Sequence, residues 1–128
     1  LLKGSGTMPT LLPSTAFFLG IEYPPARKMI DAGLGLALAS DYNPGSSPSG
    51  RMPFIWSLAC IKLKMRPMEA LAAATLNAAY AMGMENELGS ITPGKRASFI
   101  ITHPAPSVEY FPYSFGSDWI RQVVIDGN

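Results

Sequence analysis

The feature that most constrains the fold is a short apolar run, residues 36–39, which is followed closely by a lone carboxylate, Asp41. The run shows no alternation of polar and apolar residues, which is typical of a parallel strand covered on both faces. A loop rich in proline, glycine and serine follows at residues 43–47, and Asp41 is the only charged residue between Asp31 and Arg51. Since α/β folds place their chemistry at the carboxyl ends of parallel strands, this position predicts a functional site.

The residues before this point predict a parallel unit of strand, helix and strand. An apolar run bounded by prolines at residues 7–13 predicts a first strand, and residues 36–40 form the second. Between them, a proline pair suits the first turn of a helix over residues 26–32, and Gly33 suits the left-handed residue that closes it. This order predicts an α/β fold with a right-handed crossover, either a (β/α) barrel or a doubly wound sheet.

The second half of the chain predicts helices first and strands last. Apolar spacing predicts helices over residues 52–64 and 67–82. Short β-prone runs predict strands over residues 98–102 and 123–125, and the stretch 104–119 predicts a proline- and aromatic-rich loop. We therefore expect two structural layers.

Composition excludes several classes of function. With 128 residues, 48% of them hydrophobic and 15% charged, the chain has the length and core of one domain. A net charge of +1 favours neither nucleic acid nor an anionic membrane. A single cysteine, no signal-peptide pattern and no apolar stretch of roughly 18 residues predict a cytoplasmic protein without a membrane span.

Asp41 and the loop after it each have two interpretations. The carboxylate of Asp41 could bind Zn²⁺ or Fe²⁺ and move a proton, or it could form an Asx turn, which the local sequence favours. The loop at residues 43–47 offers an amide, backbone N–H groups and two hydroxyls. These groups could hold a carboxylate or phosphate, or they could be ordinary turn formers.

Three other polar residues make weaker candidates. Arg51 could join an anion site, but we expect it to be solvated. His103 is the only histidine, so we expect a surface or turn residue and not a metal ligand. Cys60 has no basic neighbour before Lys62, so we expect a buried, unreactive thiol.

Residues 35–47 read Gly-Leu-Ala-Leu-Ala-Ser-Asp-Tyr-Asn-Pro-Gly-Ser-Ser, and they closely resemble the segment around the last barrel strand of the imidazolonepropionase family. Those enzymes are metal-dependent amidohydrolases of histidine degradation. Residues 4–14 resemble the family's preceding strand, and residues 57–60 resemble its helix after the loop. Residues 68–79 and 89–97 resemble the closing signature of the wider amidohydrolase superfamily, so the resemblance covers nearly the whole chain.

The resemblance implies part of a metal-dependent (β/α)₈ TIM barrel. Residues 1–86 would be its last two βα units, and residues 87–128 would be strands of a small β-sandwich. One Zn²⁺ or Fe²⁺ would be held by Asp41 together with histidines from earlier strands. The family's His-x-His pair and later metal histidine have no counterpart here, and a barrel needs roughly 250 residues. We therefore expect an inactive carboxy-terminal fragment.

The resemblance also implies a reaction, with a small molecule as substrate. The full-length enzyme would hydrolyse the cyclic amide bond of 4-imidazolone-5-propanoate to N-formimidoyl-L-glutamate. Asp41 would relay a proton from the attacking water to the departing nitrogen, while Asn43, Gly45 and Ser46 would contact substrate or product. A homodimer is one assembly that the resemblance leaves open.

Two other functions remain open at this point. The parent could be another amidohydrolase, such as a deaminase or a chlorohydrolase, which would share Asp41 without needing Asn43, Gly45 and Ser46 together. The chain could also be a non-catalytic module that uses the loop at residues 43–47 to hold an anion or to assemble.

Overall fold

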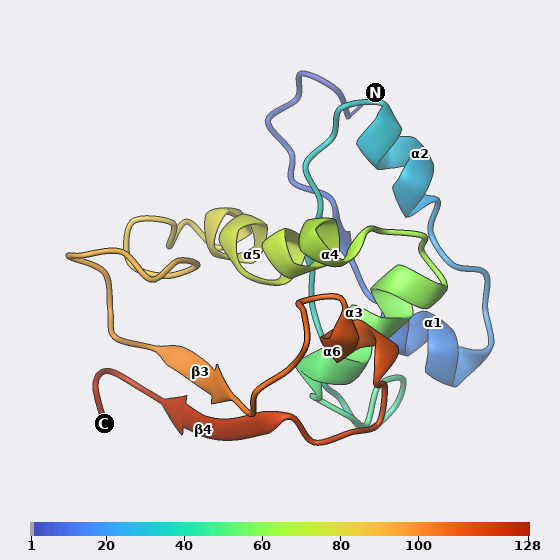
Figure 1. Ribbon diagram of the computed structural model, residues 1–128. Helices are drawn as coiled ribbons and strands as arrows, with labels where there is room; N and C mark the ends of the chain where they lie inside the picture. Colours follow the sequence, from blue (N-terminus) through green and yellow to red (C-terminus); the bar gives the residue numbers. More distant parts are fainter. Residues whose placement is uncertain (1) are drawn as a thin grey trace.

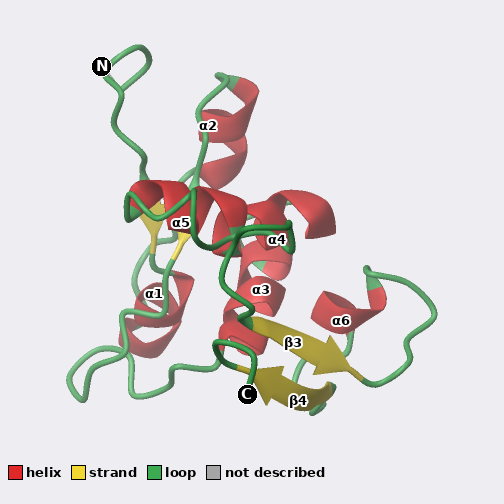
Figure 2. Cartoon of the chain, turned by 90° about the vertical axis from the view of Figure 1, so that its left-hand side faces the viewer, coloured by secondary structure: helices red, strands yellow, loops and turns green. Residues whose placement is uncertain are grey.

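The structure is a computed structural model, and it describes residues 2–128. Its elements are, in chain order, β1 (Thr10–Leu11), α1 (Pro13–Leu19), α2 (Ala26–Asp31), β2 (Ala37–Leu38), α3 (Met52–Ile61), α4 (Pro67–Ala74), α5 (Leu76–Ala81), β3 (Phe99–Thr102), α6 (Tyr110–Tyr113) and β4 (Ile120–Val124). The strands form two sheets, β1–β2 and β3–β4. Figures 1 and 2 show that these two sheets lie apart from each other.

The pairing of β1 with β2 confirms the predicted parallel unit. Leu11 lies opposite Leu38 in the register, and both side chains are buried. Each strand has only two residues, fewer than the sequence predicts. Pro9, directly before β1, has no N–H to donate to a ladder, but its carbonyl accepts from the N–H of Ala37 over 2.9 Å.

Two helices connect these strands, although the sequence predicts only one. Helix α2 and the left-handed Gly33 (φ 83°) lie where the sequence predicts them. The sequence does not predict helix α1, because Pro13 also suits the end of a strand. Proline is also common in the first turn of a helix. The helix has seven residues and ends at the left-handed Gly20 (φ 65°).

The predicted helix over residues 67–82 is wrong in one respect, because it is broken into α4 and α5 at Thr75. The Thr75 hydroxyl donates back to the carbonyl of Leu71 over 2.8 Å, a bond that often bends helices. The helix predicted over residues 52–64 corresponds to α3, which ends earlier, at Ile61. The left-handed Lys64 (φ 57°) lies outside it.

In the last part of the chain the structure confirms both predicted strands and corrects the predicted loop between them. Strands β3 and β4 pair antiparallel, and β4 begins three residues before the predicted start. The predicted loop at residues 104–119 contains the short helix α6. The ring centroid of its Phe111 lies 4.6 Å from that of Trp119 and 6.1 Å from that of Trp56 in α3, and both pairs of rings are tilted. Aromatic packing, which shows no sequence periodicity, therefore orders this stretch.

The core joins the parallel strands to the helices that follow them. Helices α4 and α5 both contact β2, and α3 packs on α4. The Asn77 side chain of α5 donates to the carbonyl of Leu36 over 2.8 Å, which ties this helix to the start of β2. The core side chains are Leu11, Ala26, Leu36, Leu38, Ile55, Trp56, Ala59, Leu63, Met65, Ala70, Ala73 and Trp119.

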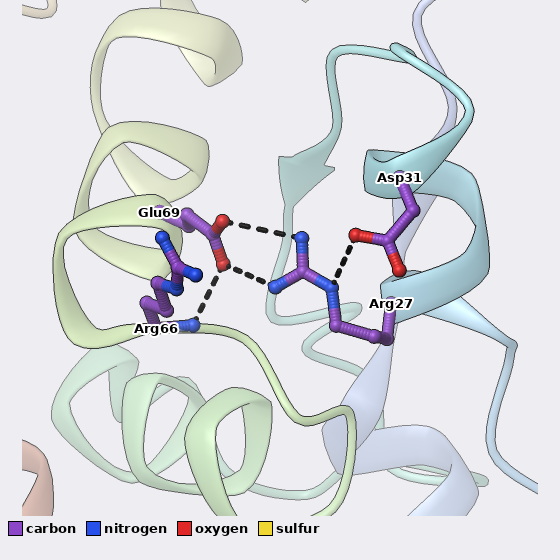
Figure 3. Close-up of polar contacts among 4 residues, drawn as sticks. All are labelled: Arg27, Asp31, Arg66 and Glu69. Carbon is purple, nitrogen blue, oxygen red and sulfur yellow. Dashed lines mark hydrogen bonds and ion pairs between the residues drawn. The ribbon is translucent and has the colours of Figure 1, made fainter.

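A network of ion pairs joins α2 to the start of α4 (Figure 3). Arg27 donates to both oxygens of the Glu69 carboxylate, over 2.8 and 3.2 Å. Glu69 also accepts from the backbone N–H of Arg66 over 2.7 Å, so it caps α4. Asp31 accepts from Arg27 Nε over 2.9 Å, within α2's own turn.

None of the helices in residues 2–128 is long and apolar enough to cross a membrane.

Candidate functional site

The carboxyl ends of β1 and β2 meet at Asp41, as the sequence predicts. Asp41 lies just after β2, half-buried and in the left-handed region with φ 50°. Thr15, in the helix that follows β1, donates its hydroxyl to Asp41 Oδ2 over 2.7 Å. A side chain that follows one strand therefore touches the carboxylate that follows the other.

The Asx turn in this loop is formed by Asn43 and not by Asp41. Asn43 Oδ1 accepts from the backbone N–H groups of Gly45 and Ser46 over 2.9 and 2.8 Å. Its Nδ2 group donates to the backbone carbonyl of Asp41 over 2.6 Å. The backbones of Asn43 and Ser47 also bond each other in both directions. The turn thus leaves the Asp41 carboxylate outside it.

Buried serines hold the main chain on either side of Asp41. Ser47 is fully buried, and its hydroxyl lies 2.8 Å from the carbonyl oxygen of Ser40. The same hydroxyl lies 2.9 Å from Ser14 Oγ, which is also buried. Because buried polar groups are costly when unpaired, this cluster favours one geometry for the loop.

The Asp41 carboxylate fits the chemistry of a metal ligand, but as one ligand of a larger set. Within the described residues no hydrogen bond reaches Oδ1, whereas Oδ2 is held by Thr15. Carboxylate oxygen is a common ligand of Zn²⁺ and Fe²⁺. Across residues 2–128 no group of three or more His, Cys, Asp or Glu side chains could hold an ion.

The three weaker candidates lie away from these groups. Arg51 is exposed, with Nη2 3.7 Å from Asp118 Oδ1, which confirms that it is solvated. His103 is exposed as expected, and its backbone N–H donates to Trp119 over 2.9 Å. Burial, with the negative charge of Glu69 as a smaller cause, raises the pKa of Cys60 to about 11, which supports an unreactive thiol.

Ser14 and Thr15 are the site residues that the sequence reasoning missed. A signal for them does exist in the sequence. They follow the first predicted strand directly, as Asp41 follows the second, and carboxyl ends of parallel strands share one edge. The mistaken extent of the first strand, residues 7–13, hid the fact that Pro13 opens a helix there.

This arrangement is found in a chain that belongs to the amidohydrolase family, since the model of that family matches residues 2–128. Among curated proteins the chain is similar to imidazolonepropionases. It is 60% identical to that of Flavobacterium johnsoniae and 57% identical to that of Christiangramia forsetii, over 126 residues each. Each match covers 98% of this chain and 31% of the relative. The chain therefore spans about a third of the length of these relatives.

Solved structures of a deaminase and a chlorohydrolase contain the same fold. An adenosine deaminase from Xanthomonas campestris with bound zinc superposes with a TM-score of 0.81 at 25% identity, over 92% of this chain and 30% of that one. A mutant atrazine chlorohydrolase from Arthrobacter aurescens, complexed with zinc, has a TM-score of 0.81 at 19% identity. That match covers 96% of this chain and 31% of the chlorohydrolase.

Proposed function

We propose that this chain forms the closing part of an imidazolonepropionase. In this proposal residues 1–86 are the last two βα units of a (β/α)₈ barrel, and residues 87–128 contribute strands to a small β-sandwich. The parallel β1–β2 pair and the separate antiparallel β3–β4 pair support that division. The 60% identity to an imidazolonepropionase supports the choice among amidohydrolases.

One observation carries the functional proposal. Asp41 stands at the carboxyl end of a buried parallel strand with one oxygen held by Thr15 and no hydrogen bond to the other within the described residues. A carboxylate so placed is restrained in direction and retains a free ligand atom. The proposed metal, Zn²⁺ or Fe²⁺, would be held by Asp41 Oδ1 and by side chains from outside this chain.

A bound metal of this kind would polarise the ring carbonyl and make hydroxide available near neutral pH. Asp41 would accept a proton from the attacking water at its carboxylate and return it to the departing ring nitrogen, as a general base and then a general acid. The substrate would be 4-imidazolone-5-propanoate, and the product would be N-formimidoyl-L-glutamate.

The loop after Asp41 would bind polar groups of substrate or product chiefly through side-chain donors, the Ser46 hydroxyl and the Asn43 amide. Ser46 Oγ lies 3.0 Å from Asn43 Nδ2, so a rotation of Ser46 towards a ligand would free one N–H of that amide. The backbone N–H groups of Gly45 and Ser46 already donate to Asn43 Oδ1. This internal use of the amides disfavours the alternative of a stand-alone anion-binding module, which needs them free.

The proposal is tested with the product of the complete reading frame that contains this sequence. We expect it to convert 4-imidazolone-5-propanoate to N-formimidoyl-L-glutamate, and removal of metal by a chelator to abolish turnover. Asp41→Asn keeps the shape of the side chain but loses the base, and we expect it to lower kcat at least about 100-fold. Asp31→Asn, which changes an exposed carboxylate of α2, is the matched control.

The proposed function would be contradicted by an activity typical of other members of the family. Turnover of an aminopurine or a chlorinated triazine without turnover of imidazolonepropanoate would overturn the proposal in favour of a deaminase or chlorohydrolase. Gel filtration of the same sample tests whether the complete protein is a homodimer, which stays an expectation from the resemblance.

A further inference from the structure

We propose that Thr15 is a positioning residue for Asp41: its hydroxyl holds one carboxylate oxygen so that the other points at the metal. This inference rests on the proposed role of Asp41 as a metal ligand. It adds a residue from the preceding βα unit to the site. It also gives a reason for a polar side chain in the first turn of α1.

The contact between the two residues has the geometry of a strong hydrogen bond. Thr15 Oγ1 and Asp41 Oδ2 are 2.7 Å apart, a distance typical of a hydroxyl that donates to a carboxylate. Both residues are partly buried, so water competes weakly for the bond. The two residues are 26 positions apart in the chain, and only the pairing of β1 with β2 brings them together.

The backbone of α1 is itself anchored beside the loop, which makes Thr15 a fixed donor. Its neighbour Ser14 is buried and lies 2.9 Å from the hydroxyl of Ser47. Ser47 in turn reaches the carbonyl of Ser40, the residue before Asp41. Two adjacent residues of α1 therefore hold the segment that follows β2: Ser14 acts through the Ser47 hydroxyl, and Thr15 bonds the Asp41 carboxylate directly.

The backbone of Asp41 is left-handed, and the Thr15 hydroxyl is the one hydrogen-bond partner of its carboxylate among the described residues. With φ 50° Asp41 occupies a region that residues other than glycine rarely adopt, although aspartate tolerates it better than most. Nothing else among the described residues bonds the Asp41 carboxylate. Without the Thr15 hydroxyl, no hydrogen bond among the described residues restrains rotation of the Asp41 side chain about χ1 and χ2, and we expect the ligand atom to lose its fixed direction.

The test compares Thr15→Val with Thr15→Ser in the complete protein. Valine keeps the branched shape of threonine but has no hydroxyl, whereas serine keeps the hydroxyl and loses the methyl group. We measure the dissociation constant for Zn²⁺ by competition with a chromophoric chelator, and the visible absorption of the Co²⁺-substituted protein. We expect Thr15→Val to weaken zinc binding about 10- to 100-fold, as for other residues that orient a metal ligand.

Two further results complete this expectation. Thr15→Ser should restore affinity to within a few-fold of the parent, and the Co²⁺ spectrum should change in the valine variant alone. Thr75→Val is the matched control, because it removes a hydroxyl that also bonds a protein oxygen at 2.8 Å but on an exposed helix junction. It should leave zinc affinity and the cobalt spectrum unchanged.

The inference is overturned if Thr15→Val binds zinc like the parent with an unaltered cobalt spectrum. It is equally overturned if Thr15→Ser fails to restore affinity, because the methyl group and its packing would then be what matters. Failure of the proposed function looks different. A complete protein that does not hydrolyse imidazolonepropanoate, yet loses zinc affinity on Thr15→Val and recovers it on Thr15→Ser, would leave the role of Thr15 standing.

Discussion

At the scale of single residues, Asn43 forms the Asx turn that the local sequence assigns to Asp41. Either residue could form an Asx turn, because both have a short side chain with an oxygen in the right place. The structure gives the turn to Asn43, whose oxygen accepts two backbone N–H groups. Asp41 instead receives the hydroxyl of Thr15. The distinction depends on a partner that is distant in sequence.

Cys60 provides a prediction at the same scale. Since burial raises the pKa of its thiol to about 11, roughly one thiol in a thousand is ionised at pH 8. We expect Cys60 in the complete native protein to react with a disulfide reagent on the order of 100-fold more slowly than in the unfolded protein. Its rate should still rise with pH above 9, where an unperturbed thiol levels off.

The measurement is a stopped-flow thiol titration, with Cys60→Ala to subtract any other cysteines of the complete protein. An equal rate for native and unfolded protein at pH 8 would contradict the prediction. That result would mean that the half-buried thiol is open to solvent and ionises normally.

At the scale of elements, an ion pair joins helix α2 to the start of helix α4. Arg27 pairs with both oxygens of Glu69, and Glu69 also caps α4 through the N–H of Arg66 (Figure 3). The hydrogen bond from Arg27 is the largest cause of a lowered pKa for Glu69. Because the pair is partly exposed, solvent and salt screen much of its attraction.

We expect Glu69→Gln to lower the melting temperature of the complete protein at pH 7. A carboxylate whose pKa is depressed on folding stabilises the folded state above its unfolded pKa, near 4.3, and loses that contribution as pH falls through the folded value. The difference from the parent should therefore persist from pH 7 to pH 5 and shrink below pH 4. Thermal unfolding followed by circular dichroism across this range measures it.

Asp31→Asn is the control for this experiment. Asp31 accepts a single bond from Arg27 within the same helix, and its side chain is 65% exposed, so we expect a much smaller shift. Equal shifts for the two variants would show that the link between the helices adds nothing beyond surface charge. A pH-independent shift for Glu69→Gln would point to lost packing instead of the ion pair.

At the scale of the whole molecule, large apolar side chains are exposed on helix α1 and on the β3–β4 sheet. Phe17, Phe18 and Leu19 of α1 are each about half exposed. On the β3–β4 pair, Ile100 and Val123 are similarly exposed. Within residues 2–128, β1 and β2 pair only with each other, so each strand has an edge without a partner among these residues. Such surfaces are typical of faces that another part of a protein covers.

We therefore expect the 128-residue chain, produced by itself, to self-associate and to bind a hydrophobic dye. The complete protein should give a single species of defined size with little dye binding. Size-exclusion chromatography with light scattering and dye fluorescence makes the comparison. A monomeric 128-residue chain that unfolds cooperatively would contradict the prediction and favour a self-sufficient module.

The amino-acid sequence suffices to predict the parallel unit, the helix at residues 26–32 and the position of Asp41 at a strand end. Each of these features has a local signal. An apolar run without polar alternation indicates the buried strand, and a proline pair and Gly33 mark the two ends of the helix. The position of Asp41 follows from a single carboxylate between the apolar run and a turn. Motifs of the same local kind supported the resemblance to amidohydrolases, which the family match over residues 2–128 confirms.

The groups that touch Asp41 follow from the three-dimensional packing of the chain. The sequence does not predict helix α1, because a proline such as Pro13 suits a strand end and a helix start equally. It does not predict helix α6, because contacts between aromatic side chains leave no periodic pattern in the sequence. The bond from Thr15 joins residues 26 positions apart. No local propensity encodes such a contact, because it arises when the β1–β2 pairing brings two strand ends to one edge.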